Sequence, residues 1–228
     1  MDLSIIHKKI LQLAAEIAPF LETKNEPMQL IHLDLVPQAE RVAFANEVIK
    51  ISAYLGINPN WLLQVMYAES KLKPWIENEN GGATGLIQFM PATAVSLGTT
   101  TAALKRMTRL QQLQYVKKYY AWKRGKMKSY FDVYLVTFFP AALGQNDNYI
   151  FKTSRLSPGI IARQNKIMDY NKNGAITMAE FKKYIVDATP KNVRALVFNN
   201  DTNDTNGTNG TNGTILIGIA LIAFVLLG

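Results

Sequence analysis

The stretch from residue 58 to residue 94 constrains the fold more than any other part of the chain. Asn58 is a favourable N-cap and Pro59 a favourable first-turn residue, so the sequence predicts an apolar helix from there to Glu69. A glycine-rich turn follows, and Pro91 opens a second helix. These signals predict a mainly helical fold in which a carboxyl group ends one helix and faces a tight turn.

The position of Glu69 on its helix has a chemical consequence. Glu69 shares a helix face with Val65 and Met66. Burial against apolar side chains raises the pKa of a carboxyl, because desolvation disfavours the charged form, and a protonated carboxyl can act as a general acid near neutral pH. The glycines of the turn permit positive φ, so the turn can bring Gln88 and main-chain amides near the carboxyl. By themselves these residues also fit a solvated glutamate followed by an ordinary loop.

The order and spacing of these residues resemble the soluble lytic transglycosylases, lysozyme-like enzymes that cut the glycan strands of peptidoglycan. The resemblance rests on the pair Glu69 and Ser70, a short variable loop, and the run Gly-Ala-Thr-Gly-Leu-Ile-Gln-Phe-Met-Pro-Ala-Thr-Ala at residues 82–94. It implies a lysozyme-like helical domain over residues 41–165. It also implies that Glu69 is the catalytic acid, that Ser70 positions substrate and that Gln88 lines the cleft.

A third motif of this family is altered here. The family usually adds a helix that ends in Ala-Tyr-Asn-x-Gly and presents a tyrosine to the catalytic carboxyl, but the corresponding residues are Phe138, Phe139 and Pro140. Tyr134, one helical turn earlier, is predicted to supply the hydroxyl and to contact substrate; packing within the helix is the other interpretation. The Phe-x-Pro-Ala-Ala ending resembles bacteriophage variants of the domain and supports a phage origin.

The resemblance implies a mechanism with one carboxylate. Glu69 would protonate the glycosidic oxygen between N-acetylmuramic acid and N-acetylglucosamine, then accept the proton of the C6 hydroxyl of the same muramic acid, which gives a 1,6-anhydro product. Ordinary glycosidases use two carboxylates. Glu77 or Glu79 would be the second in a muramidase, although both lie in a polar run that predicts an exposed loop. From another class of protein, a weakly catalytic structural connector of a virion or membrane is the further alternative.

Residues 169–180 form a second motif, which fits the twelve-residue calcium loop of EF-hand proteins, with Gly174 at the sixth position and Ile176 at the eighth. An entering helix is predicted around residues 160–168, and residues 166–198 form the predicted EF-hand-like lobe. Only two ligands carry charge, so we expect a structural Ca²⁺ of modest affinity; a metal-free turn is the alternative. The predicted ligands are Asp169, Asn171, Asn173, the carbonyl of Ala175, Thr177 and Glu180.

The C-terminal residues predict a tethered membrane anchor. Residues 199–214 contain only Asn, Asp, Thr and Gly, which is typical of a flexible linker. Residues 215–228 carry no polar or charged side chain. A helix of that length spans ~21 Å, against a hydrocarbon core of ~30 Å, so tilt or bilayer thinning would be needed for a transmembrane tail anchor. A buried core helix is the alternative, but the linker separates this segment from any core.

The N-terminal residues 1–40 predict an amphipathic helical extension, because apolar residues recur at helical spacing up to Pro19. No secretory signal peptide is recognised there, since Asp2 precedes the first basic residues. We therefore expect delivery within a particle, as a virion component of a membrane-containing phage, or release by lysis. The expected partners are peptidoglycan glycan strands, a membrane at the C-terminal tail, and other virion proteins.

Composition adds two constraints. The 228 residues contain no cysteine, which excludes disulfides, and 48% hydrophobic residues support one core with extensions. The net charge of +8 includes a basic cluster interleaved with Tyr119, Tyr120 and Trp122, which could meet anionic wall polymer, anionic lipid or nucleic acid. Such a pattern is more often an ordinary helix surface, and nucleic acid is not an expected partner. The cluster consists of Lys117, Lys118, Lys123, Arg124, Lys126 and Lys128.

Overall fold

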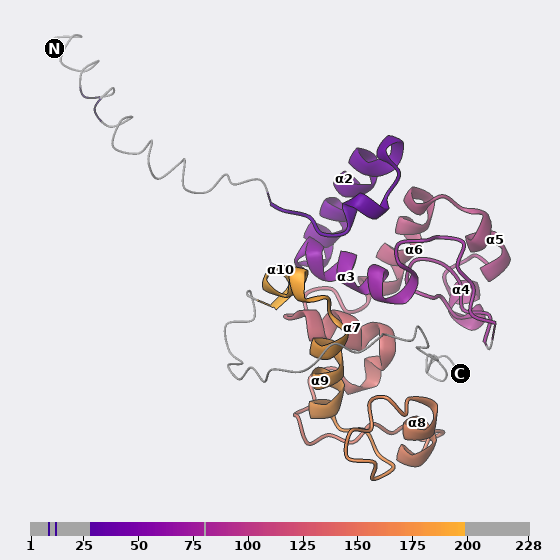
Figure 1. Cartoon of the computed structure of the whole chain (residues 1–228). Helices are drawn as coiled ribbons and strands as arrows, with labels where there is room; N and C mark the ends of the chain where they lie inside the picture. Colours follow the sequence, from indigo (N-terminus) through magenta and orange to yellow (C-terminus); the bar gives the residue numbers. More distant parts are fainter. Residues whose placement is uncertain (1–8, 10–11, 13–27, 80, 199–228) are drawn as a thin grey trace.

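The structure is a computed structural model that describes residues 9, 12, 28–79 and 81–198 (Figure 1). The described part is mainly helical, as predicted, and its only β-structure is three isolated bridges. The predicted N-terminal helix, apart from helical Lys9 and Gln12, lies outside the described residues, as do the linker and the tail anchor. Within the described ranges, no helix combines the length and apolar character needed to cross a bilayer.

Most of the helices follow one another through short connections, but long segments separate α3 from α4 and η2 from α8. A 3-10 turn η1 (Leu33–Leu35) precedes two long helices, and two further 3-10 turns, η2 (Pro140–Ala142) and η3 (Lys191–Val193), lie in the second half. The α-helices are α2 (Gln38–Leu55), α3 (Pro59–Ser70), α4 (Pro91–Ser96), α5 (Thr101–Arg106), α6 (Arg109–Ala121), α7 (Tyr130–Phe138), α8 (Pro158–Gln164), α9 (Met178–Ala188) and α10 (Arg194–Phe198).

Helix α3 is the centre of the fold, in contact with α2, α7 and α10 (Figure 1). Its predicted start is confirmed: the Asn58 side chain accepts a hydrogen bond of 2.8 Å from the Asn60 amide, and Pro59 is the first helical residue. The helix ends at Ser70, because Lys71 and Leu72 both adopt left-handed φ, 54° and 59°. Glu69 therefore lies in the last turn of a helix most of whose residues are buried.

One hydrophobic core runs through the described residues. Ile31 and Val36, before the predicted boundary at residue 40, belong to it, and that boundary falls inside α2. At the other end, the Trp61 indole N–H donates to the Val197 carbonyl at 2.8 Å, which joins α10 to α3. The segments predicted as an extension and as a separate lobe thus share the core of residues 41–165.

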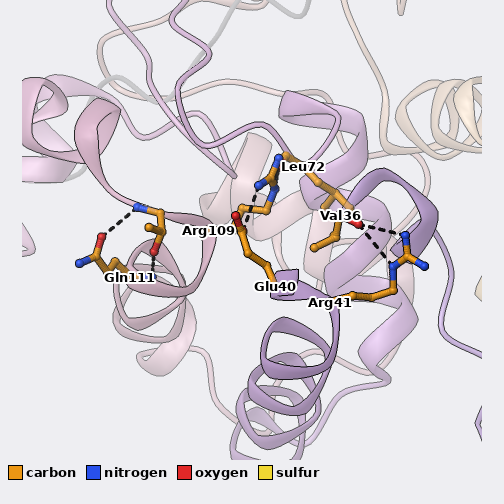
Figure 2. A network of polar contacts seen from close by, with 7 residues as sticks. Val36, Glu40, Arg41, Leu72, Arg109 and Gln111 are labelled. Carbon is orange, nitrogen blue, oxygen red and sulfur yellow. Dashed lines mark hydrogen bonds and ion pairs between the residues drawn. The ribbon is translucent and has the colours of Figure 1, made fainter. Parts of the chain in front are cut away.

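The turn that follows α3 is fixed by Arg109, the first residue of α6. Its Nε donates to the Leu72 carbonyl at 2.8 Å and its Nη1 forms an ion pair of 3.0 Å with Glu40 of α2. Figure 2 shows this network, together with Arg41 bonded to the Val36 carbonyl. Arg109 is buried, and a paired, hydrogen-bonded guanidinium is the form in which a buried charge is tolerated. The main chain just after Glu69 is therefore held from two helices.

Candidate active site

The Glu69 carboxyl is the most perturbed acid of the site. Its pKa is raised to about 7, chiefly because burial disfavours the carboxylate. The Tyr134 hydroxyl and the positive charge of Lys71 act in the opposite direction and lower it, but desolvation outweighs both. A carboxyl that titrates near neutral pH can both give and take a proton under the same conditions.

Tyrosines from three helices lie within electrostatic reach of Glu69. Burial raises the pKa of each phenol, and the negative charge on Glu69 raises it further, so all stay protonated and can only donate to the carboxylate. They come from α6, α7 and α9, which converge on the end of α3. These residues are Tyr119, Tyr120, Tyr130, Tyr134 and Tyr184.

Tyr134 is the tyrosine that meets Glu69. Its hydroxyl is buried and, among the residues that the structure describes, has no hydrogen-bond partner at ordinary distance and angle. It interacts with the Glu69 carboxyl through a looser contact that still lowers the pKa of that carboxyl. Apo active sites often hold such hydrogen bonds long or poorly aligned. The structure thus brings Tyr134 to Glu69, although the contact with substrate stays a prediction.

The altered third motif is buried in the core. Phe138 stacks on Phe181 with ring centroids 5.5 Å apart, and Phe139 lies 5.1 Å from Phe151. These rings join α7 to α9 and to the segment before α8. Phe139 and its neighbours therefore pack the core, and Tyr134 on the preceding turn of α7 is the residue that presents a hydroxyl to Glu69.

The glycine-rich turn folds back on itself beside α3. Thr84 and Phe89 exchange two main-chain hydrogen bonds of 3.0 and 2.9 Å, and Gly85 has φ 84°. Gln88 also has positive φ, 52°, and its side-chain amide donates to the Gly85 carbonyl at 3.1 Å and more weakly to Ile76 at 3.3 Å. Gln88 is partly buried, so the side-chain amide is oriented by the turn that carries it.

Ser70 joins that turn to α3. Its hydroxyl oxygen lies 3.0 Å from the carbonyls of both Met66 and Leu86, and it donates to one or the other. Ser70 is buried, so in this structure its hydroxyl holds the turn against the end of α3. The substrate-positioning role of Ser70 stays a prediction.

Gln112 on α6 completes the turn and was not found from the sequence. Its Oε1 accepts from the Leu86 amide at 2.9 Å, and its Nε2 donates to the carbonyls of Pro74 and Leu104, both at 2.7 Å. A fully buried amide with three main-chain partners satisfies groups that the turn itself cannot pair. No local signal marks this residue, because its partners lie up to 38 residues away.

A second group of unpredicted residues surrounds the end of α3. The His32 ring stacks on Tyr67 at 3.9 Å, and Lys71 Nζ lies 3.8 Å from the centre of the same Tyr67 ring. His32 Nε2 is also 2.7 Å from Gln64 Oε1, and burial lowers its pKa. Tyr67 and Lys71 are sequence neighbours of Glu69, but His32 comes from the predicted extension and could be placed here only by the fold.

The carboxylates proposed for a hydrolytic mechanism lie elsewhere. Glu77 is exposed and paired with Lys105 at 2.6 Å, and Glu79 is exposed, as its polar surroundings predicted. Among the described residues, neither contributes to the shifted pKa of Glu69, whose charged neighbour is Lys71. The arrangement provides one carboxyl with tyrosine donors, and no partner carboxylate that acts on it.

The predicted calcium loop has its oxygens turned inward. The Asp169 carboxylate accepts from the amides of Asn173 and Gly174 at 3.1 and 3.0 Å, while Asn171 Oδ1 accepts from the Asn173 amide at 2.9 Å. The two Glu180 oxygens accept from the amides of Asn171, at 3.4 Å, and Thr177, at 2.9 Å. Among the described residues, no three acidic or histidine side chains gather as metal ligands; this loop combines two carboxylates with neutral oxygens.

A neighbouring segment stabilises the loop. The Ile176 carbonyl accepts from the Phe151 amide, and the Met178 amide donates to the Tyr149 carbonyl, both at 2.9 Å. Thr177 and Glu180 form a capping box that starts α9. The entering helix α8 begins at Pro158 and ends at Gln164, earlier than the range predicted from sequence, because Asn165 caps it.

Together these features define a mainly helical domain with a candidate acid-base site built around the Glu69 carboxyl, whose pKa is raised by desolvation. Residues 47–114 match the family described as the transglycosylase SLT domain. The match includes Glu69, Ser70, Gln88 and Gln112, ends before Tyr134, and covers less than half of the chain. It supports the resemblance to lytic transglycosylases and hence activity on peptidoglycan. Comparisons with curated proteins and with solved structures give no match.

Proposed function

We propose that the protein is a lytic transglycosylase that cleaves the bond between N-acetylmuramic acid and N-acetylglucosamine in peptidoglycan. The observation that carries the proposal is the Glu69 carboxyl, whose pKa is about 7 beside the Tyr134 hydroxyl and is not shifted by any other carboxylate of the described residues. The match over residues 47–114 supplies the substrate class.

The single carboxyl suits a reaction in which one group first donates and then accepts a proton. Protonated Glu69 gives its proton to the glycosidic oxygen, the bond from that oxygen to C1 of muramic acid breaks, and the glucosamine leaves with a free hydroxyl. The Glu69 carboxylate then takes the proton of the C6 hydroxyl, whose oxygen bonds to C1 and closes the 1,6-anhydro ring. Tyr134 stabilises the carboxylate between the two transfers, because a phenol can only donate to it.

Mass spectrometry of the muropeptides released from purified peptidoglycan tests this proposal. Anhydro-muramic ends are expected. Reducing ends would identify a muramidase, the alternative in which a carboxylate such as Glu77 activates water, and the ion pair between Glu77 and Lys105 speaks against that role. Absence of any product from folded protein would instead favour the weakly catalytic virion or membrane connector.

The pH dependence should reveal the role of Tyr134. Rate should fall as pH rises through about 7, because Glu69 must be protonated to donate. Tyr134→Phe removes a donor that lowers the pKa of Glu69, so the alkaline limb should move to higher pH while the maximal rate falls about tenfold, the worth of one hydrogen bond to a charged group.

Tyr120→Phe is the matched control, because the Tyr120 hydroxyl bonds to Thr137. This change should lower the melting temperature without shifting the alkaline limb of the pH–rate profile. If Tyr134→Phe also changes only the melting temperature, Tyr134 is a packing residue. Its hydroxyl then does not stabilise the Glu69 carboxylate between the two proton transfers.

We propose in addition that residues 215–228 anchor the protein in a membrane and that residues 199–214 tether the domain to that anchor. Continuous apolar character behind a polar linker supports the anchor. Tethering suits an enzyme carried by a membrane-containing phage particle that opens peptidoglycan during entry, and the Phe138-Phe139-Pro140 ending supports a phage origin.

The loop at residues 169–180 is proposed to hold a structural calcium ion. Asp169, Asn171, Asn173, Thr177 and Glu180, with the Ala175 carbonyl, are hard oxygen donors of the kind that calcium takes. Bound calcium would supply positive charge that neutralises Asp169 and Glu180. The loop residues meanwhile join α8 to α9, which packs on Phe138 of the core.

Calcium should raise the melting temperature by several degrees over a chelator, because an ion that binds only the folded loop stabilises it by mass action. Glu180→Gln should remove the response. Gln keeps an oxygen for the capping box with Thr177, whereas Glu180→Ala would remove the box as well.

Asp132→Asn is a control of equal charge change, at a capping box outside the loop. The Asp132→Asn variant should have a lower melting temperature than the wild type, but calcium should still raise that temperature. Identical wild-type melting curves with calcium and with chelator would show a metal-free turn.

A further inference from the structure

A basic face lies on the end of α6 and the loop to α7. It consists of Lys117, Lys118, Lys123, Arg124, Lys126 and Lys128, with the rings of Tyr54 and Trp122. Five of the six cations are exposed, and Lys123 is half-buried. In the part of the chain that the structure describes, none of the six forms an ion pair, whereas Lys50, Lys105, Arg109, Lys182 and Lys183 each pair with a carboxylate. The basic face is thus left unneutralised.

The loop that carries the basic face is well ordered by hydrogen bonds. The Gly125 amide donates to the Leu55 carbonyl at the end of α2 at 3.1 Å, and Lys126 and Arg124 close successive turns through the Lys123 and Ala121 carbonyls. The nearest carboxylate along the chain, Asp132, accepts from the main-chain amides of Lys128 and Ser129 and so caps α7. The charges therefore sit on a fixed surface.

Aromatic rings are mixed with these cations. Lys117 Nζ and Arg124 Cζ lie 4.4 and 4.5 Å from the centre of the Tyr54 ring, and Lys123 Nζ lies 4.3 Å from that of Trp122. The Trp122 side chain is 56% exposed. Exposed Trp beside Lys and Arg is the combination enriched where proteins meet the headgroup layer of a bilayer, because the indole is amphipathic and the cations attract anionic lipid.

The chain leaves the described structure next to this face. Phe198, the last described residue, packs on Tyr130 and Phe131 with ring centroids 5.7 and 5.4 Å apart. Those two residues start α7, directly after the basic loop. A flexible linker as long as residues 199–214 has a typical span of roughly 20 Å. The apolar segment that follows would then hold the basic face near the bilayer it enters.

We propose that the basic face binds the headgroups of anionic phospholipids and docks the domain on the membrane. Proximity to the chain exit and the exposed indole favour lipid over wall polymer. The proposed docking uses charges outside the Glu69 site and is therefore a function separate from the cleavage reaction. It depends on the proposed tail anchor only because that anchor would keep the domain near the bilayer.

Headgroup quenching of Trp122 fluorescence in the full chain tests the proposal. A Trp75→Phe background leaves Trp122 as the exposed indole, because Trp61 is buried. Vesicles of phosphatidylcholine, with or without phosphatidylglycerol, carry a nitroxide-labelled headgroup. Quenching is expected only with phosphatidylglycerol, and high salt should abolish it because it screens exposed charges.

Two charge-matched variants locate the contact. Lys117→Gln with Lys123→Gln, Arg124→Gln and Lys126→Gln removes four charges from the basic face. Its control, Lys152→Gln with Arg155→Gln, Arg163→Gln and Lys166→Gln, removes four exposed charges around α8. Quenching should fall at least tenfold in the first variant and stay at the parent level in the second, with melting temperatures equal.

Three results would overturn the proposal. The first is no quenching by anionic vesicles, and the second is an equal loss of quenching in both variants. The third is that the basic-face variant loses binding to isolated peptidoglycan but keeps its binding to vesicles. The last would assign the face to wall polymer. The tail is judged separately by flotation with neutral vesicles. Failure to float there refutes the anchor, while salt-sensitive flotation with anionic vesicles would still support the basic face.

Discussion

Glu69→Gln is expected to abolish glycan cleavage, with a loss of at least a thousandfold, or about 4 kcal/mol of transition-state stabilisation. The change keeps the shape of the side chain but removes the carboxyl proposed to donate and then accept the proton. Release of anhydro-muropeptides from purified peptidoglycan measures the loss. Glu77→Gln, which breaks only the exposed ion pair with Lys105, should keep activity close to wild type.

Above neutral pH, Glu69→Gln should raise the stability of the protein although it abolishes activity. The pKa of Glu69 is about 7 in the folded protein, against an ordinary value of 4.5, so between these values the folded state holds a proton that the unfolded state has lost. Wild-type stability therefore falls as pH rises through this window, and Glu69→Gln escapes that fall. At about pH 8 the variant should be more stable, by up to about 3 kcal/mol, and near pH 4 the two should match.

These two readouts separate a chemical role from a structural one. A variant that keeps more than a tenth of wild-type turnover would place the acid elsewhere. A variant that is inactive but also less stable at every pH would mean that Glu69 supports the fold and that its loss of activity is secondary.

Gly85→Ala is expected to have the second largest effect. Gly85 has φ 84°, and a Cβ there would lie 2.4 Å from Gln112 Oε1, so the glutamine must move and release the amide of Leu86 and the carbonyls of Pro74 and Leu104. Positive φ costs about 1 kcal/mol, and each unpaired buried group adds about 1 to 3 kcal/mol. We expect the free energy of unfolding measured in urea to fall by at least about 4 kcal/mol, and little activity to remain.

Gly98→Ala is the matched control, since Gly98 has φ 81° but nothing within 4 Å of the added Cβ. It should cost only the backbone term and leave turnover unchanged. If both substitutions destabilise equally, the contact with Gln112 adds nothing and the turn does not depend on α6.

The helix that carries Glu69 and the turn after it were predictable because their signals are local. The cap at Asn58, the proline after it and the glycines of the turn act within a few residues, and the structure has the helix and the turn where they indicate. The residues that hold this segment were not predictable. Gln112 and Arg109 bind main-chain atoms of residues 72–86 from a different helix, and only the packing of α6 against α2 brings them there.

The sharing of one core across the expected domain limits could not be predicted for a related reason. Ile31 and Val197 belong to the same core as the central helix, but apolar residues near the ends of a sequence do not reveal which helix they cover. The predicted calcium loop likewise has one feature that could be predicted and one that could not. Its residue pattern is local, whereas the pairing of Ile176 with Phe151 depends on how the preceding segment returns to it.

The hydrogen bond from Trp61 to Val197 gives the protein a defined mechanical path. A force applied along residues 199–214 enters the domain through α10 and reaches α3 at Trp61, eight residues from Glu69 on the same rigid rod, or ~12 Å along its axis. Strain from a taut tether would therefore reach α3, as well as α7, on which Phe198 packs. A glycan strand held near Glu69 and a tail held at the other end would then load opposite ends of one helix.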